Sequence, residues 1–220
     1  MEKYLPVLKR CPLFQTIAEQ DILALLNCLT VKKKKYEKDA LIFCPGDDIS
    51  SVGIVLTGAI HIESDDFWGN RTIISRVESG EMFGESFSFA EDRALSVSIT
   101  TAEPTKIILI DYKKIIKTCS SACNFHTRLI QNILRNLAEQ NIALVSKMEF
   151  ITQRTTREKL LSYLSTCARN EKKPSFEIPF NRQELADFLS VERSAMSAEL
   201  GRMRDEGLIV FNKNQFKLSK

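Results

Sequence analysis

The sequence predicts an α+β protein in which an antiparallel β-roll (a double-stranded β-helix, or jelly roll) is followed by a long helix and a C-terminal helical domain. Three observations predict this class. Short apolar runs separated by turn residues fill residues 32–110, an apolar heptad pattern fills 121–151, and two short capped helices fill 181–207. The first pattern is typical of strands and the other two are typical of helices.

The composition bounds the kind of protein. The chain has 220 residues, enough for one large domain or, more typically, two smaller ones. Of these residues 44% are hydrophobic and 27% charged, as expected for a soluble globular protein. It contains no run of about 18 apolar residues, and the segment 1–6 lacks the apolar core of a signal peptide. We therefore expect a cytoplasmic protein without membrane contact. Residues 152–220 contain 13 Lys and Arg against 9 Asp and Glu, which fits a nucleic-acid-binding surface.

The β region is punctuated by glycine and proline. Strands are expected at 51–56, 59–62, 71–77 and 105–110, with turns at 45–48, 57–58, 68–70 and 78–81. Many short strands of this kind predict an antiparallel roll that can enclose a ligand cavity. Before it, residues 11–31 predict a short segment and an amphipathic helix. The lysine run 32–35 is interpreted as a solvated strand edge in preference to a nucleic-acid patch.

A long helix is predicted by apolar residues that alternate steps of four and three, the pattern of a dimeric coiled coil. The seam consists of Ile130, Leu134, Leu137, Asn141, Leu144, Met148 and Ile151. Asn141 occupies an a position, where a polar residue fixes register and favours two strands. A second face with Leu129, Ile133 and Ala138 is expected to pack on the β domain. The helix thus predicts a homodimer, and packing of both stripes within one chain is the alternative.

Two capped helices joined by a tight turn follow. Asn181 caps the first, Glu184 completes a capping box, and Gly207 ends the second. The second helix leaves four residues on its outer N-terminal face: Arg193, Ser194, Ser197 and Ala198. This is the arrangement of a helix-turn-helix, whose second helix reads the major groove of DNA. An ordinary helical hairpin is the alternative.

The remaining C-terminal segments complete a winged helix-turn-helix. A hinge is expected at 153–156, an amphipathic helix at 157–169, a strand at 176–178, and a hairpin that forms the wing at 208–218. The predicted domains are an effector-sensing β-roll at 1–120, a dimerisation helix at 121–152, and a DNA-binding domain at 153–220.

Several short motifs stand in this order along the chain. They are Pro12-Leu13-Phe14, Phe83-Gly84-Glu85 followed by Arg93, Arg157-Glu158-Lys159-Leu160-Leu161, Arg182-Gln183-Glu184-Leu185-Ala186, and Glu206-Gly207-Leu208-Ile209. In these motifs and in the order of its parts the chain resembles the CRP/FNR family of bacterial transcription regulators. The resemblance implies a homodimer that binds a palindromic site in double-stranded DNA and recruits or blocks RNA polymerase. It also implies an effector, bound between roll and long helix, that repositions the DNA-binding domains.

The resemblance assigns an effector site to Gly84, Glu85, Ser86, Arg93 and Ala94. In the cyclic-nucleotide-binding members a Gly-Glu pair holds the ribose and an Arg-Ser pair holds the cyclic phosphate. Here the serine is Ala94.

The long helix also departs from those members. It carries the apolar residues 142–145 where a Thr-Ser pair would contact adenine. Both departures predict a small-molecule effector other than cyclic AMP, anionic or partly apolar. An ion pair between Glu85 and Arg93 that braces the roll is the alternative.

No metal or haem is expected. Cys11 and Cys28 stand too far apart to resemble the N-terminal cysteine cluster of the oxygen-sensing members. A lone histidine such as His61 or His126 is more often structural than a haem ligand. The six cysteines are interpreted as buried or free thiols, because only Cys119 and Cys123 are close in sequence. Thiol oxidation at these two residues remains an open alternative.

The resemblance also assigns DNA-binding residues: Arg182, Gln183, Arg193, Ser194, Ser197, Ala198 and Arg202. Arg193 matches the family position that reads guanine, whereas Ala198 replaces the second arginine of this helix. Operator preference is therefore expected to differ from the best-known half-sites. Arg202 is expected to contact phosphates or to form surface ion pairs.

Two other function classes are open to the chain. One is a cyclic-nucleotide-binding-type interaction module that contacts a protein instead of DNA. The other, an enzyme, is disfavoured, because the sequence contains two histidines and no Ser/His/Asp set, phosphate-cradling loop or HExxH motif.

Overall fold

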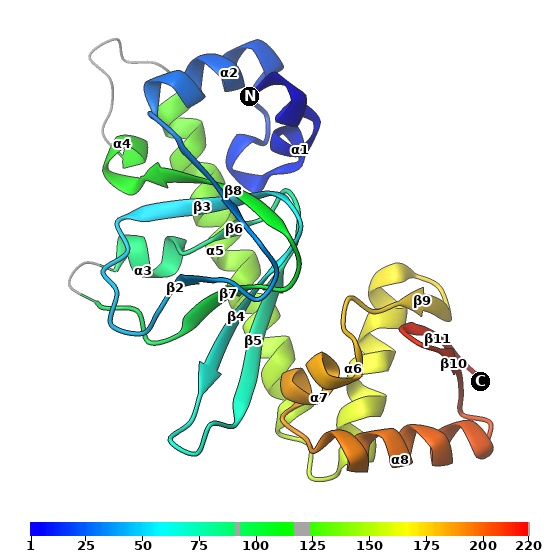
Figure 1. The fold of residues 1–220 in the computed structure, drawn as a ribbon. Helices are drawn as coiled ribbons and strands as arrows, with labels where there is room; N and C mark the ends of the chain where they lie inside the picture. Colours follow the sequence, from blue (N-terminus) through cyan, green and yellow to red (C-terminus); the bar gives the residue numbers. More distant parts are fainter. Residues whose placement is uncertain (91–92, 117–123, 220) are drawn as a thin grey trace. The chain divides into compact units, whose positions relative to one another are not determined.

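The computed structural model describes residues 1–90, 93–116 and 124–219. A β-roll, a long helix and a C-terminal helical domain follow one another in the predicted order, which confirms the α+β fold class (Figure 1). The chain divides into two compact units. The first comprises Met1–Asn70 and Ile74–Gln140, and the second Arg71–Ile73 and Asn141–Lys220.

Two four-stranded antiparallel sheets form the roll. One has the order β1 (Lys32–Tyr36), β8 (Thr105–Asp111), β3 (Ser51–Thr57) and β6 (Met82–Phe83). The other has the order β2 (Leu41–Phe43), β7 (Ser98–Thr101), β4 (Ile60–Asp65) and β5 (Arg71–Val77). Successive residues of β3 and β8 alternate between two buried clusters, one of which contains Ile54 and Ile108 and the other Val55 and Ile107. Both faces of this sheet are therefore covered. Strand β1 lies at the sheet edge, as its lysine run predicts.

The other elements of the roll are helical. They are the 3-10 helices η1 (Glu2–Tyr4) and η2 (Pro12–Phe14) and the α-helices α1 (Leu5–Arg10), α2 (Glu19–Cys28), α3 (Glu85–Phe89) and α4 (Tyr112–Ile116). The long helix α5 spans Asn124–Ile151. Its residues Leu129 and Ile133 are buried in the same cluster as Ile108, which confirms their predicted packing on the β domain. The prediction is wrong for Ala138, which is exposed, because a step of five residues from Ile133 carries it off the buried side of the helix. Asn132 of α5 donates hydrogen bonds to the carbonyl oxygens of Leu13 at 2.9 Å and Gln15 at 2.8 Å.

The C-terminal unit is a winged helix-turn-helix. Its elements are α6 (Thr156–Glu171), β9 (Ser175–Glu177), α7 (Arg182–Leu189), α8 (Arg193–Asp205), β10 (Ile209–Asn212) and β11 (Gln215–Leu218). The strands form a sheet in the order β10-β11-β9, and the helices bury Leu160, Leu185 and Leu200 against Phe216 of β11. Within the predicted hinge, Thr155 caps α6 and forms a capping box with Glu158. This part of the hinge is therefore the start of a helix.

The capping box of α7 is present as predicted. The Oδ1 atom of Asn181 accepts hydrogen bonds from the backbone N–H groups of Gln183 and Glu184, at 2.9 and 3.0 Å. The Oε2 atom of Glu184 accepts one from the N–H of Asn181 at 2.8 Å. The next residue that turns the chain is Ser190, whose φ of 52° places it in the left-handed region.

Loss of this cap is expected to destabilise the C-terminal domain. In Asn181→Ala the N–H groups of Gln183 and Glu184 lose their acceptor, so we expect the free energy of unfolding to fall by about 1 kcal/mol. Urea denaturation followed by circular dichroism measures this change. Asn181→Ser is the matched control, because serine caps a helix nearly as well as asparagine. Equal losses in the two variants would show that the cap contributes nothing.

Candidate effector site and DNA-binding surface

The turn between β6 and α3 directs Glu85 towards the long helix α5. Gly84, the N-cap of α3, has a φ of +78°, a conformation that a residue with a Cβ rarely adopts. The backbone also runs close to β3, because a Cβ on Gly84 would lie 3.4 Å from the carbonyl oxygen of Ser51. The following residue, Glu85, is 1% exposed. The backbone conformation and the close approach to β3 thus both favour glycine at 84, next to a buried carboxylate.

Two amides of α5 hold this carboxylate. The Oε1 atom of Glu85 accepts hydrogen bonds from Asn136 Nδ2 at 2.7 Å and Gln140 Nε2 at 2.5 Å. Burial raises the pKa of Glu85 above its ordinary value, while the hydrogen bonds from its own backbone N–H, Gln140 and Asn136 act in the opposite direction. The residue assigned to a ribose by resemblance is therefore engaged by the long helix.

Three of the other predicted effector residues differ from Glu85 in burial. The side chains of Ser86, Arg93 and Ala94 are exposed. Within the described residues, no ion pair joins Arg93 to Glu85, whose hydrogen-bond partners are on α5. The residues in contact with Glu85 that the sequence analysis missed are Asn136 and Gln140. A signal for them existed, because Asn132, Asn136 and Gln140 follow one another at four-residue steps and so share one side of a helix.

The histidines and cysteines considered for haem binding or thiol oxidation differ in their surroundings. His61 is buried, and its Nε2 atom lies 3.3 Å from Nη1 of Arg76. Burial raises the pKa of the Cys11 thiol to about 12, which disfavours the reactive thiolate. Cys119, Cys123 and the side chain of His126 lie outside the described part of the structure. Within that part, no cluster of three or more His, Cys, Asp or Glu side chains could hold a metal ion.

The predicted dimer seam of α5 is uneven in its exposure. Leu134 is 62%, Leu144 50% and Met148 59% exposed, and Asn141 is exposed between them. Leu137, in contrast, packs against the buried cluster of the roll. Two residues outside the predicted seam, Ile142 at 68% and Val145 at 52%, are also exposed. The exposed apolar stripe therefore follows the steps 134, 138, 141, 145 and 148, which keep the alternation of four and three.

Helix α8 separates a buried side from an exposed one. Met196, Leu200 and Met203 are buried in the domain core. The four residues predicted to face DNA are exposed: Arg193, Ser194, Ser197 and Ala198. No ion pair or hydrogen bond within the described ranges engages the guanidinium group of Arg193. The arrangement leaves a cation and two hydroxyl groups at the start of the second helix, where a helix-turn-helix reads bases.

Other predicted DNA-binding residues have partners in this domain. The Nε2 atom of Gln183 donates to Asp187 Oδ1 at 2.8 Å. Arg182 lies over the rings of Phe211 and Phe216, with its guanidinium carbon 4.9 and 5.1 Å from their centroids. Burial lowers the pKa of Arg182, which stays far above neutrality as a guanidinium. Arg182 thus connects α7 to the wing.

The start and the end of α8 carry carboxylates. Glu192, the N-cap, accepts hydrogen bonds from the Ser194 hydroxyl and from the N–H of Ala195, the latter at 2.7 Å. These hydrogen bonds lower the pKa of Glu192. Arg202 pairs with Glu199 at 2.8 Å, so the predicted surface ion pair of Arg202 is present.

A further ion pair links α6 to the end of α8. The guanidinium group of Arg157 contacts Glu199 at 3.4 Å and also pairs with Glu206. These contacts explain two of the sequence motifs, because Arg157 and Glu206 belong to the segments that flank the helix-turn-helix.

Comparison with known proteins agrees with this geometry. A family model described as cyclic nucleotide-binding domain matches residues 33–122, and one described as Crp-like helix-turn-helix domain matches 158–219. The chain is 24% identical over 179 residues to the cAMP-activated global transcriptional regulator CRP of Haemophilus influenzae, covering 80% of this chain and 78% of that protein. It is 22% identical over 205 residues to the cyclic AMP receptor protein of Thermus thermophilus, covering 92% and 89%.

Solved structures share the fold. The c-di-GMP-responsive global regulator CLP of Xanthomonas campestris superposes with a TM-score of 0.74 at 18% identity, over 92% of this chain and 100% of that one. A mutant of CooA from Carboxydothermus hydrogenoformans gives a TM-score of 0.72 at 18% identity, over 90% and 91%. The two domain matches in this order, together with these relatives, show that the chain belongs to the CRP/FNR family of transcription regulators.

Proposed function

We propose that this regulator acts as a homodimer on an inverted repeat in double-stranded DNA and that a small molecule bound in its β-roll controls it. The observation that carries the proposal is the exposed start of α8. There the Arg193 guanidinium is free of ion pairs within the described residues, and the opposite side of the helix is buried. An arginine in this position can donate two hydrogen bonds to guanine O6 and N7.

Dimerisation is supported by the apolar stripe of α5. Leu134, Val145 and Met148 are each more than half exposed, whereas apolar residues on the other side of the helix are buried. Exposed Asn141 lies within the stripe, where a polar residue can pair with its counterpart and fix register. A second copy of α5 would cover the stripe and would place two reading helices for two half-sites.

The effector is proposed to be a small molecule other than cyclic AMP. Relatives of similar fold respond to different molecules, since one is described as cAMP-activated, one as c-di-GMP-responsive, and a third, CprK, as complexed with OCPA. In this chain Asn136 and Gln140 already satisfy the Glu85 atom Oε1. Exposed Ala94 also supplies no hydroxyl group. An effector that contacted Glu85 would compete with α5, and this competition couples the roll to the dimer helix.

The rival function is a module that binds a protein partner through its C-terminal helices. Selection of random DNA duplexes by the purified protein discriminates between the two. Recovery of an inverted repeat supports the regulator, and we then expect a contact with RNA polymerase and a cytoplasmic site of action, where the DNA is. Failure to enrich any sequence, with or without effector-containing cell extract, would contradict the proposal.

The pKa shift of Glu85 predicts a pH dependence of stability. Burial makes the folded protein hold the Glu85 proton more tightly than the unfolded chain does. The stabilising contribution of this carboxyl is therefore complete at acid pH, and it is lost as the pH rises through the raised folded-state pKa. Relative to Glu85→Gln, which cannot ionise, the wild-type protein should become progressively less stable from acid to neutral pH.

Urea titrations of both proteins at a series of pH values measure this difference. Glu139→Gln is the control, because it removes a carboxylate that is exposed on the long helix. A wild-type minus Glu85→Gln difference that stays constant with pH would refute the assignment.

A further inference from the structure

The phenol of Tyr4 is a buried polar group without a partner. Tyr4, in η1, is 5% exposed, and within the described residues its hydroxyl oxygen has no hydrogen-bond partner. A buried hydroxyl that has left water without gaining a hydrogen bond destabilises the folded protein. A buried hydroxyl of this kind indicates a binding site when the residues around it could bind the same ligand.

Three lysines surround this phenol. The Nζ atoms of Lys3 and Lys33 each lie 5.1 Å from the centroid of the Tyr4 ring. Lys106 is the third, since its charge lowers the pKa of the phenol together with the charges of Lys3 and Lys33. Burial raises the pKa of Tyr4, but the charges of Lys106, Lys3 and Lys33, and the approach of the Lys3 ammonium group to the phenol oxygen, together hold it below its ordinary value.

The pairing of β1 with β8 explains why these lysines gather. Lys33 stands opposite Ile108, and Lys35 opposite Lys106. Because side chains alternate along a strand, Lys33, Lys35 and Lys106 share the sheet face of Ile108, whose buried cluster includes Tyr4. Lys32 and Lys34 project from the opposite face. The lysine run therefore consists of two sets, and only one of them faces Tyr4.

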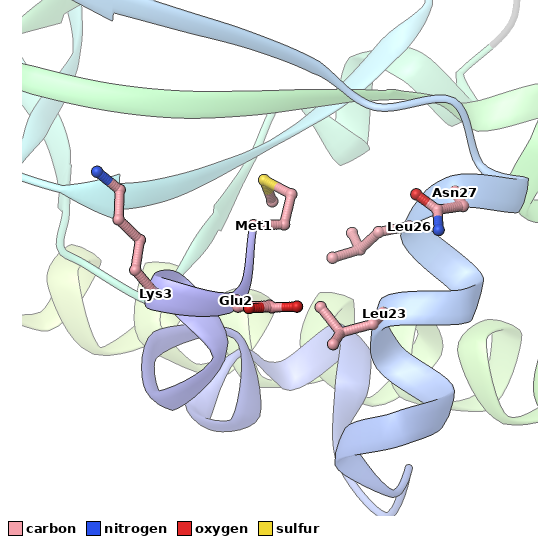
Figure 2. Close-up of a pocket in the computed structure, with 6 residues that line it drawn as sticks. All are labelled: Met1, Glu2, Lys3, Leu23, Leu26 and Asn27. Carbon is pink, nitrogen blue, oxygen red and sulfur yellow. The ribbon is translucent and has the colours of Figure 1, made fainter.

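Lys3, in η1, lies near the same Tyr4 ring as Lys33 does. Figure 2 shows a shallow pocket at the N-terminus, in which the Lys3 side chain extends away from Leu23 and Leu26. Lys35 forms an ion pair with Glu37 at 2.9 Å. Within the described ranges, Lys3, Lys33 and Lys106 form no ion pair with a carboxylate. Three positive charges and one hydroxyl group are therefore concentrated without an anion.

Protection of a sheet edge accounts for part of this arrangement. Lysines on an edge strand prevent pairing with another chain, and they do so on either face. This role explains the exposure of Lys32 and Lys34 as well as of Lys33. It does not require a buried phenol, nor two further elements, η1 and β8, that contribute cations beside it.

We propose that Lys3, Tyr4, Lys33 and Lys106 form a binding site for a phosphate-type dianion, either inorganic phosphate or the terminal phosphoryl group of a small metabolite. The Tyr4 hydroxyl donates one hydrogen bond to a phosphate oxygen, and the three ammonium groups donate others while they balance the charge. A dianion suits three cations better than a chloride ion or a monoanion. The site does not include Glu85, and it is independent of DNA binding.

Titration with inorganic phosphate at constant ionic strength, with sodium chloride as the balancing salt, tests this proposal. The chain has four tyrosines, so the ring signals of ¹³C-tyrosine-labelled protein can be followed by NMR and Tyr4 identified with Tyr4→Phe. We expect a saturable shift of the Tyr4 signal. The phosphate affinity should fall about tenfold or more in Tyr4→Phe and in Lys106→Gln, as for the loss of a hydrogen bond to a charged group.

A matched charge control separates a built site from general attraction. The double variant Lys33→Gln/Lys106→Gln should lose saturable binding. Lys32→Gln/Lys34→Gln removes the same charge from the opposite face of β1 and should bind phosphate as the wild type does. Equal weakening in both variants would show non-specific screening and would overturn the proposal.

The tyrosine pKa provides an independent readout. A bound anion opposes the three lysines, so saturating phosphate should raise the pKa of Tyr4 measured by the ring shift, and sodium chloride should not. Titrations with pyrophosphate and with a 5′-mononucleotide distinguish free phosphate from a phosphorylated metabolite. If instead only duplex DNA shifted Tyr4, the lysines would be a nucleic-acid contact and the small-anion site would be refuted.

Discussion

Arg193→Ala is expected to abolish the preference of the protein for its operator and to leave weak, salt-sensitive binding to any duplex. The exposed guanidinium of Arg193 is at the start of α8, where two donors can reach guanine O6 and N7. Such a contact contributes about 1–3 kcal/mol of discrimination, and a dimer would lose it twice. Fluorescence anisotropy with the selected operator and a scrambled duplex, over a series of salt concentrations, measures the ratio of the two affinities.

Arg202→Ala is the control for this experiment. Arg202 is in the same helix, and its substitution by alanine removes the same charge. Its guanidinium group, however, is paired with Glu199. We expect it to weaken binding to the operator and the scrambled duplex alike, as loss of a phosphate contact or a surface ion pair would. Unchanged discrimination in Arg193→Ala would show that another residue reads the guanine. Equal loss of discrimination in both variants would assign the effect to charge alone.

Val145→Glu is expected to convert the protein to a monomer that remains folded. Val145 is 52% exposed in a single chain, so a carboxylate there can be solvated. In a dimer two such carboxylates would be buried against each other, at a cost that a helix–helix interface does not tolerate. We expect operator affinity to fall about 100-fold or more, because the second half-site contact ceases to be intramolecular.

Sedimentation equilibrium gives the mass, and anisotropy gives the operator affinity. Glu139→Lys is the control, since Glu139 is an exposed polar residue of the same helix outside the stripe. It should remain dimeric. Leu137→Ala provides a contrast, because Leu137 packs against the roll and its truncation should lower stability. A dimeric Val145→Glu protein with full affinity would place the interface elsewhere.

The elements that the sequence predicts best are those whose cause is local. The capping box of Asn181 and Glu184, the extended pattern of 71–77 and the helical periodicity of α5 each depend on residues within a few positions of one another. The short strands β2, β6 and β7 were not predicted. Their two to four residues carry too few alternations for a period to be recognised, and pairing with distant strands determines them.

The candidate site was only partly predictable for the same reason. Gly84 and Glu85 could be named from a short motif, but the partners of Glu85 lie 51 and 55 residues further along the chain. Likewise Arg182 was assigned to DNA, and its position over Phe211 depends on where the wing hairpin folds back. The roles of Glu85 in effector binding and of Arg182 in DNA binding stay predictions, because each depends on contacts with another molecule.

Asn132, Asn136 and Gln140 give α5 a mechanical property. The first holds the carbonyl groups of Leu13 and Gln15, and the other two hold the carboxylate of Glu85. Since all three amides project from one side of the same rigid rod, a rotation of the helix about its long axis would strain every one of these bonds at once. We therefore expect a displacement of the Glu85 carboxylate to be transmitted along the helix to the bonds of Asn132, so that these hydrogen bonds break together.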